Sequence, residues 1–162
     1  MKPFLIPTLL LLSLPLAALE IRVQPGEVVY AYEVDPARGL YTVMLQNVAV
    51  VQKDGGPVTL ESLEIRAGSG GQVLQTLVIP AADLEKSARR LSAMEAQGLL
   101  KLYDFHFQTS RYLEGLKIAS NRTLSPGSAL IVFGKPLLLA GLPSDGLTIV
   151  ARGKDGTRAA SP

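Results

Sequence analysis

LYTVMLQNVAVVQKDGGPVTLESLEI, residues 40–65, is the stretch that decides the fold. Two apolar runs rich in Val, Leu, Ile and Thr flank the segment Lys53-Asp54-Gly55-Gly56. Such residues suit a pleated, half-buried surface, and Asp-Gly and Gly-Gly supply the positive φ of tight turns. We therefore predict a β-hairpin in the middle of a sheet. Residues 40–51 are apolar on both faces, which indicates a central strand covered on both sides.

The second run changes phase in its middle. Val58 and Leu60 share one parity, whereas Leu63 and Ile65 share the other. A slip of one residue would turn the later apolar side chains to the wrong face of the sheet. We predict a β-bulge at Glu61-Ser62, which restores the face.

Short alternating or apolar runs continue on both sides of this stretch. They are separated by Gly, Pro and Asp-Gly turn signals, among them Gly68-Ser69-Gly70-Gly71, which is read as a hairpin turn. The predicted strands are 27–34, 72–79, 99–108, 112–120, 129–133, 136–140 and 147–151. Pro136 lacks an N–H, so the break before the sixth of them is expected at a sheet edge or at a crossing between sheets.

One helix interrupts the strands at residues 81–97. Leu84, Ala88 and Leu91 recur at helical spacing, Asp83 stands in the first turn, and Gly98 stands where a C-terminal cap belongs. The apolar stripe is narrow and rich in Ala. The helix is therefore expected to lie across a sheet edge or one open end of the domain.

The N-terminus has the layout of a secretory signal peptide. Lys2 precedes an apolar run, with small residues at Ala17 and Ala18, and the apolar core is shorter than the roughly 20 residues that span a bilayer. We predict cleavage after Ala18; the alternative is an uncleaved membrane anchor, because Leu16 is large for the −3 position. No Cys follows the run, which excludes a bacterial lipoprotein. The predicted organisation is signal peptide 1–18, one domain 19–156 and a flexible tail 157–162.

Composition limits the class of protein. The chain has no Cys and a formal net charge of only +2. An exported chain without disulfides fits a bacterial envelope better than a small animal secreted module, so a periplasmic or extracellular location is expected. Without a basic cluster, nucleic acid is not an expected partner.

Regularly spaced short strands predict an all-β antiparallel sandwich with one inserted helix. The segments Gln24-Pro25-Gly26, 45–50, 57–60 and 124–128 together resemble the immunoglobulin-like β-sandwich domains of exported bacterial proteins. The antibody-type Cys and Trp landmarks are absent, so only the architecture carries over. The resemblance implies an accessory or adhesion module, and by analogy one that can stand in front of a cell-wall peptidase of the LytM type.

Reactive chemistry finds little support. His106 is the only histidine, so a His- or Cys-based zinc site has no further ligands, and no G-x-S-x-G nucleophile elbow is present. The pairs Glu61/Glu64 and Asp83/Glu85 are read as residues beside a bulge and in a helix first turn rather than as a glycosidase pair. The sequence predicts a protein that is not an enzyme and uses no cofactor or metal.

Two surfaces are candidates for binding. Lys86, Arg89 and Arg90 concentrate positive charge on one helix face, which is read either as a solvated face or as a contact for a partner. Tyr30, Tyr32 and Tyr103 are the candidate aromatic platform for a sugar. The first hypothesis is an exported protein-interaction or accessory module that binds an envelope protein. The alternative is a module that binds polysaccharide or peptidoglycan, and an enzyme of unfamiliar type comes third.

Overall fold

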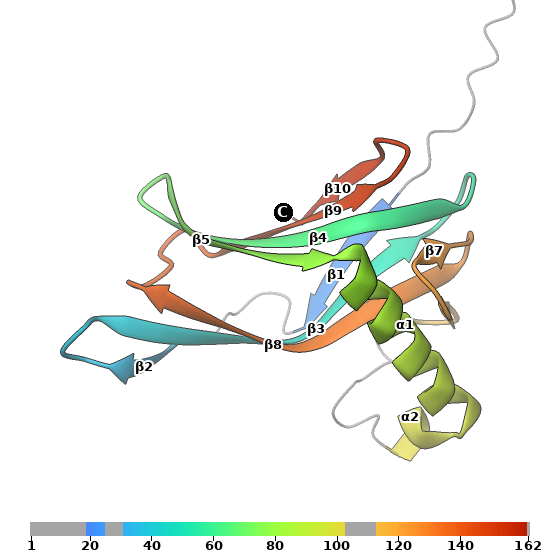
Figure 1. Ribbon diagram of the computed structural model, residues 1–162, viewed down its shortest axis with the longest axis horizontal. Coiled ribbons are helices and arrows are strands. Elements are labelled where there is room, and N and C mark those ends of the chain that lie inside the picture. Colours follow the sequence, from blue (N-terminus) through green and yellow to red (C-terminus); the bar gives the residue numbers. More distant parts are fainter. Residues whose placement is uncertain (1–18, 25–30, 103–112, 162) are drawn as a thin grey trace, which may run out of the picture.

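The computed structural model describes residues 19–24, 31–102 and 113–161, which form two β-sheets packed face to face (Figure 1). The first sheet contains β1 (Leu19–Gln24), β2 (Ala31–Asp35), β3 (Leu40–Gln52), β6 (Lys117–Ile118) and β8 (Ser128–Ala140). The second sheet contains β4 (Val58–Ser69), β5 (Gln72–Pro80), β7 (Thr123–Leu124), β9 (Leu147–Gly153) and β10 (Arg158–Ala160). Two helices, α1 (Ala81–Ala96) and α2 (Leu99–Leu102), connect β5 to the first sheet.

The strand order is that of an immunoglobulin-like sandwich. The path β1-β3-β8 corresponds to strands A-B-E, and the path β10-β9-β4-β5 corresponds to G-F-C-C′. The long pairings are antiparallel, and only the two-residue β6 pairs with β8 in parallel. The predicted fold class, an all-β sandwich with one inserted helix at about 81–97, is confirmed.

The stretch 40–65 crosses between the sheets instead of forming a hairpin, so that prediction was wrong. β3 has β1 and β2 on one side and β8 on the other, whereas β4 lies between β9 and β5. The buried Gln52 side chain donates to the carbonyl oxygens of Asp54 and Gly56, each at 2.7 Å, and so curls the loop as it leaves the first sheet. Gly and Asp-Gly residues favour a change of direction, but they do not determine whether the two strands then pair.

The predicted bulge at Glu61-Ser62 is confirmed. Leu60 pairs with Gly153 and Ser62 with Arg152 of β9, so Glu61 is the extra residue. The β4–β5 hairpin turns at Gly70 and Gly71, which both have positive φ. Asp145 fastens this turn, since its Oδ2 accepts a hydrogen bond from Gly71 N at 2.7 Å.

The main core lies between the sheets. Fully buried members include Val50, Leu63, Ile65, Leu139 and Ile149. On β3, odd-numbered residues such as Val43 face the core in the first part of the strand, and even-numbered residues such as Val48 face it further along. A second cluster lies on the outer face of the first sheet, under the helices.

Helix α1 lies across one edge of the sandwich, as the narrow stripe predicts. Leu84 and Ala88 pack into the main core, whereas Leu91, further along the helix, packs on the second cluster. Gly98, with φ of 70°, follows the C-cap residue Gln97. The helix therefore closes part of the open side and then passes onto the outer face of the first sheet (Figure 1).

Four further expectations need correction. Residues 99–102 are the helical turn α2 rather than the start of a strand, because Leu100 continues the helical packing onto the second cluster. Only Lys117–Ile118 of the segment 112–120 is strand within the described residues. β8 runs unbroken through Pro136, so the predicted break is absent; the expected edge position of Pro136 is confirmed, because β6 pairs with β8 only at Ser128 and Ala129. The predicted tail 157–162 contains β10, because Arg158–Ala160 pairs with β9.

Several expectations fall outside the described residues: the signal peptide 1–18, the start of the strand at 27–34, and the rest of the strand at 99–108. Neither described helix has the length and apolar character that crossing a membrane requires.

Candidate functional site

The outer face of the first sheet has two unlike halves. Under the helices, its side chains are Ala49 and Val51 of β3 and Ala129 and Ile131 of β8, all at most 1% exposed. Leu91 and Leu100 of the helices, together with Leu113, cover them. This part of the face is a closed apolar contact within the chain.

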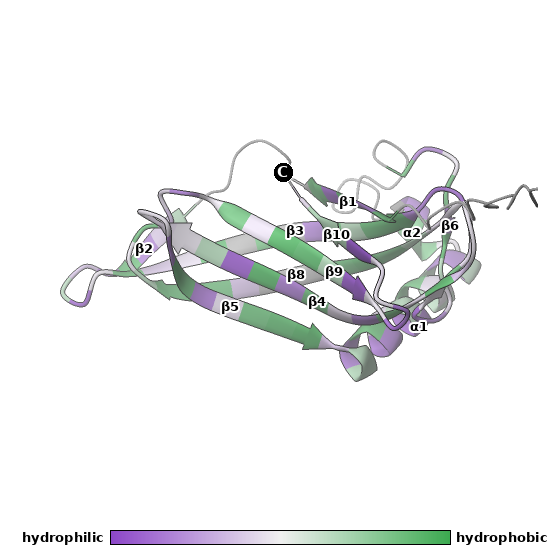
Figure 2. Cartoon of the chain, turned by 90° about the horizontal axis from the view of Figure 1, so that it is seen from above, coloured by the Kyte–Doolittle hydropathy of each residue, from purple (hydrophilic) through white to green (hydrophobic). Residues whose placement is uncertain are grey.

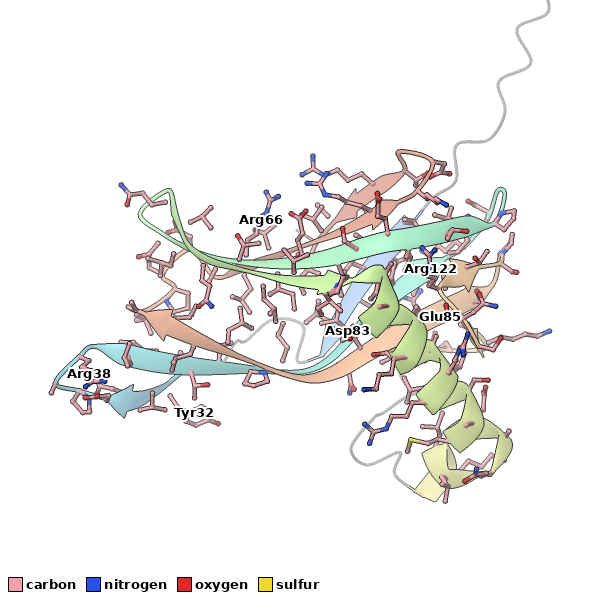
Figure 3. All side chains as sticks on the ribbon, viewed as in Figure 1. Tyr32, Arg38, Arg66, Asp83, Glu85 and Arg122 are labelled. Carbon is pink, nitrogen blue, oxygen red and sulfur yellow. The ribbon has the colours of Figure 1, made fainter. Side chains whose placement is uncertain are left out.

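The other half carries apolar side chains that the described residues leave open. Tyr32 of β2, Thr42 of β3 and Leu138 of β8 form one row across the three strands. Tyr32 is 59% exposed and Leu138 is 55% exposed, and Val34, the extra residue of a bulge between Glu33 and Asp35 on β2, is 52% exposed. We call Tyr32, Val34 and Leu138 the bare patch. Figure 3 shows Tyr32 pointing away from the second sheet.

The predicted aromatic platform is described only at Tyr32; Tyr30 and Tyr103 lie outside the described residues. Tyr41 is in register with Glu33, one position from Tyr32, so its ring lies on the opposite face. Its hydroxyl donates to Glu33 Oε1 at 3.3 Å. The described strands therefore present one tyrosine on the outer face, among aliphatic side chains.

The basic helix face is partly committed to structure. Lys86, Arg89 and Arg90 are all exposed on α1. Arg89 Nε donates to Glu85 Oε1 at 3.0 Å, and the backbone N–H of Arg122 donates to Glu85 Oε2 at 3.0 Å. The Arg122 hydrogen bond, and next to it Arg89, keep the pKa of Glu85 below its ordinary value. Glu85 therefore fastens α1 to the segment before β7, and Arg89 is its ion-pair partner (Figure 3).

A shallow hollow of about 360 Å³ lies on this helix surface, lined by Ala82, Glu85, Lys86 and Arg89. It is open to solvent, and its one carboxylate is already paired with Arg89. It offers a charged rim without an enclosed interior. Small-molecule sites are usually concave and bury most of the ligand's surface. The hollow suits a surface contact better than an enclosed small ligand.

The outer face of the second sheet carries a cluster of paired charges. Glu64 Oε1 accepts a hydrogen bond from Arg152 Nε at 2.7 Å, and Oε2 is paired with Arg66. Arg152, and then Arg66, lower the pKa of Glu64 to about 2. Figure 2, which looks down on this sheet, shows hydrophilic bands alternating with hydrophobic ones along β4 and β9. Paired charges protect this face along β4 and β9.

Of the carboxylates weighed as catalytic pairs, Glu64 and Glu85 each have structural partners within residues 19–24, 31–102 and 113–161. No group of three or more His, Asp or Glu side chains in these ranges could hold a metal ion. Glu64 is tied to two arginines, and Glu85 is tied to Arg89 and Arg122. His106 lies outside the described residues.

Two features of the surface were missed from the sequence. Leu138 belongs to an apolar run that was predicted only as a strand, and the place of β8 beyond the helices shows that this side chain is bare. Val73 and Val78 of β5 are 62% and 53% exposed, and this exposure was not predicted for the strand 72–79. The signal that was available is the lack of any charged residue in residues 72–79.

Comparison with known proteins adds no family. No protein-family model matches the chain, and no curated protein is detectably similar to it.

Proposed function

We propose that this chain is a non-catalytic, exported envelope domain that binds another protein. The signal-like N-terminus supports export to the periplasm or beyond. The single observation that carries the binding is the bare patch, in which three large apolar side chains are each more than half exposed. Clustered exposed apolar residues on a folded domain are typical of interaction sites.

The patch supports a protein partner because of its shape and chemistry. It lies on a sheet face rather than in a cavity, and Tyr32 combines an apolar ring with a hydroxyl. Aromatic residues are enriched at protein interfaces, where one end is buried and the other stays wet. A partner with a complementary apolar surface would cover Tyr32, Val34 and Leu138 together.

The test is site-specific photocrosslinking in bacterial cells that express the full chain. A benzophenone amino acid at position 32 is expected to give a discrete adduct with another envelope protein. The double variant Val34→Lys/Leu138→Lys is expected to abolish that adduct, because two charges would be desolvated in the contact. An adduct that persists in the double variant would contradict the proposal.

The basic helix face provides the matched comparison. If Lys86, Arg89 and Arg90 form the contact, changing all three to Glu abolishes the photocrosslinked adduct. The double variant Val34→Lys/Leu138→Lys would then still form the adduct. We expect the reverse, because Arg89 already pairs with Glu85. Both variants keep every described core residue.

A carbohydrate- or cell-wall-binding module is the second candidate, and the exposed ring of Tyr32 is the observation that favours it. Sugar faces pack on aromatic rings, so this function predicts retention on peptidoglycan or polysaccharide resin and loss of retention in Tyr32→Ala. Free passage of the wild-type chain through such resins rejects it.

A further inference from the structure

The backbone of β9 fixes which way its neighbours point. Ser161 N donates to the carbonyl oxygen of Ile149 at 2.8 Å, and Ile149 N donates to Ser161 Oγ at 2.9 Å. The backbone groups of Ile149 therefore face away from β4. In an antiparallel ladder, successive residues turn these groups to alternate sides. Val150 accordingly faces β4, where it is in register with Glu64.

The same alternation reaches β5. If Glu64 faces β9, then Ile65 faces β5, where it is in register with Leu77. On β5, the residues on either side of Leu77 then turn their N–H and C=O groups outward. Thr76 and Val78 thus present two donors and two acceptors along the free side of β5, with which no described strand pairs.

Other sheet edges in the described structure are protected. β1 carries Glu20 and Arg22, joined by an ion pair of 2.9 Å, and β2 carries Glu33 and Asp35. The free part of β8 contains Pro136, and β6, β7 and β10 are only two or three residues long. Charges, proline and shortness are the usual ways to prevent strand addition. β5, with nine residues and no charge, has none of these over its central part.

One bulge limits the open stretch. Ala67 pairs with Gln75 and Gly68 with Val73, so Leu74 is the extra residue on β5. The helix α1 begins directly after Pro80. The regular, open edge is therefore residues 75–79, about 17 Å of extended chain.

We propose that this edge, residues 75–79 of β5, accepts an extended, uncharged segment of a partner protein as an additional strand. The proposal rests on the proposed function, that this domain binds protein. It adds a second binding surface, the β5 edge, to the bare patch and states which kind of partner segment the edge would bind. Main-chain hydrogen bonds to Thr76 and Val78 provide the affinity. The alternation of side chains along the added strand determines which partner sequences are preferred. Residues of the added strand that lie beside Leu77 and Ile79 face the core and are apolar; those beside Thr76 and Val78 face solvent.

A second copy of this chain fits the edge less well. Two β5 strands paired about a twofold axis would bring about five residues from each side into contact, whereas stable interfaces use roughly 20–30 residues a side. A flexible segment needs only the edge itself. Self-association is therefore an outcome of the test rather than the proposal.

The probe is a dye-labelled synthetic heptapeptide, Lys-Val-Thr-Val-Thr-Val-Lys, titrated into the full chain and followed by fluorescence anisotropy. Its five uncharged central residues match the length of the open edge, and the two terminal Lys residues lie beyond it and keep the peptide soluble. Saturable binding is expected. Thr76→Pro removes an N–H that points to the free edge and should weaken binding about tenfold or more, because hydrogen bonds of the ladder are lost. Thr76→Val keeps that N–H and is the matched control, with affinity expected to stay within about twofold.

Folding of each variant is checked by circular dichroism. If Thr76→Pro does not fold, Val78→Lys replaces it, because a charge at this exposed position deters strand addition while it leaves the β4 ladder complete. Equal binding by the wild-type chain and by the folded edge variant would overturn the proposal, and so would absence of binding by the wild-type chain.

The two proposals fail separately. The double variant Val34→Lys/Leu138→Lys is expected to bind the peptide as the wild-type chain does, since the bare patch lies on the other sheet. A photocrosslink that persists without peptide binding would leave the proposed function standing and reject strand addition. Sedimentation of the chain alone as a dimer that Thr76→Pro dissociates would assign the edge to a second copy, and so overturn the partner segment.

Discussion

The two halves of the outer face of the first sheet differ in what covers them and in the size of their side chains. Both are apolar, but Ala49 and Ile131 lie under α1 and α2, whereas Tyr32 and Leu138 lie in the open. Small residues occupy much of the covered half and permit close approach of the helices. Large residues occupy the bare half. The bare half is the surface that the proposed protein partner would cover.

The largest expected effect comes from the covered half. Leu91→Ala should lower the free energy of unfolding by about 2–4 kcal/mol, because it removes a fully buried side chain and leaves a cavity. Leu138→Ala, in the bare half, should cost less than about 0.5 kcal/mol. Urea denaturation of the two variants measures both. Similar decreases in the free energy of unfolding for the two variants would contradict the conclusion that one half is buried and the other exposed.

The outer face of the second sheet sharpens the comparison, because charges rather than a helix protect it. Glu64→Gln should lower the free energy of unfolding by roughly 1–2 kcal/mol at neutral pH, less than the pKa shift alone suggests, because both arginines are partly exposed.

The pH dependence of this loss is fixed by the sign of the shift. The pKa of Glu64 is depressed to about 2 from an ordinary value of 4.5, so its stabilisation is fully present above about pH 5. It should decline as the pH falls from 4.5 towards 2. Denaturation of the wild type and of Glu64→Gln along a pH series tests this expectation, and a gap that stays constant down to pH 2 would contradict it.

The smallest expected change in stability belongs to Leu138→Lys. An exposed position should tolerate the charge, with a change of less than about 0.5 kcal/mol in the free energy of unfolding. Binding of a hydrophobic dye to the native chain should fall, because the patch is interrupted. Unchanged dye binding would place the exposed apolar surface elsewhere on the molecule.

Local signals in the sequence predicted local structure well. The spacing of Leu84, Ala88 and Leu91 gave the helix and its place across an edge, and the phase change between Leu60 and Leu63 located the bulge. Both features, the helix and the bulge, depend on residues that are close together in the sequence.

The partner of each strand was harder to predict. The turn at Lys53–Gly56 has the composition of a hairpin, yet the chain crosses to the other sheet there, because β3 already has neighbours on both sides. Three residues such as Arg158–Ala160 carry too little pattern to reveal a strand, and they become one only because β9 offers an edge. The exposure of Leu138 and the open edge of β5 follow from these long-range neighbours, so the candidate surfaces lay beyond sequence reasoning.

The central pair of the first sheet has a consequence for how the domain is made. β3 and β8 pair along their whole length, joining Leu40 to Ala140 and Gln52 to Ser128. Contacts between such distant positions slow folding, because a long loop must close before they form. The first sheet cannot assemble until residue 128 and those after it have emerged from the ribosome. Until then the apolar residues of β3 lack their partner strand, so the growing chain exposes them to contact with other chains.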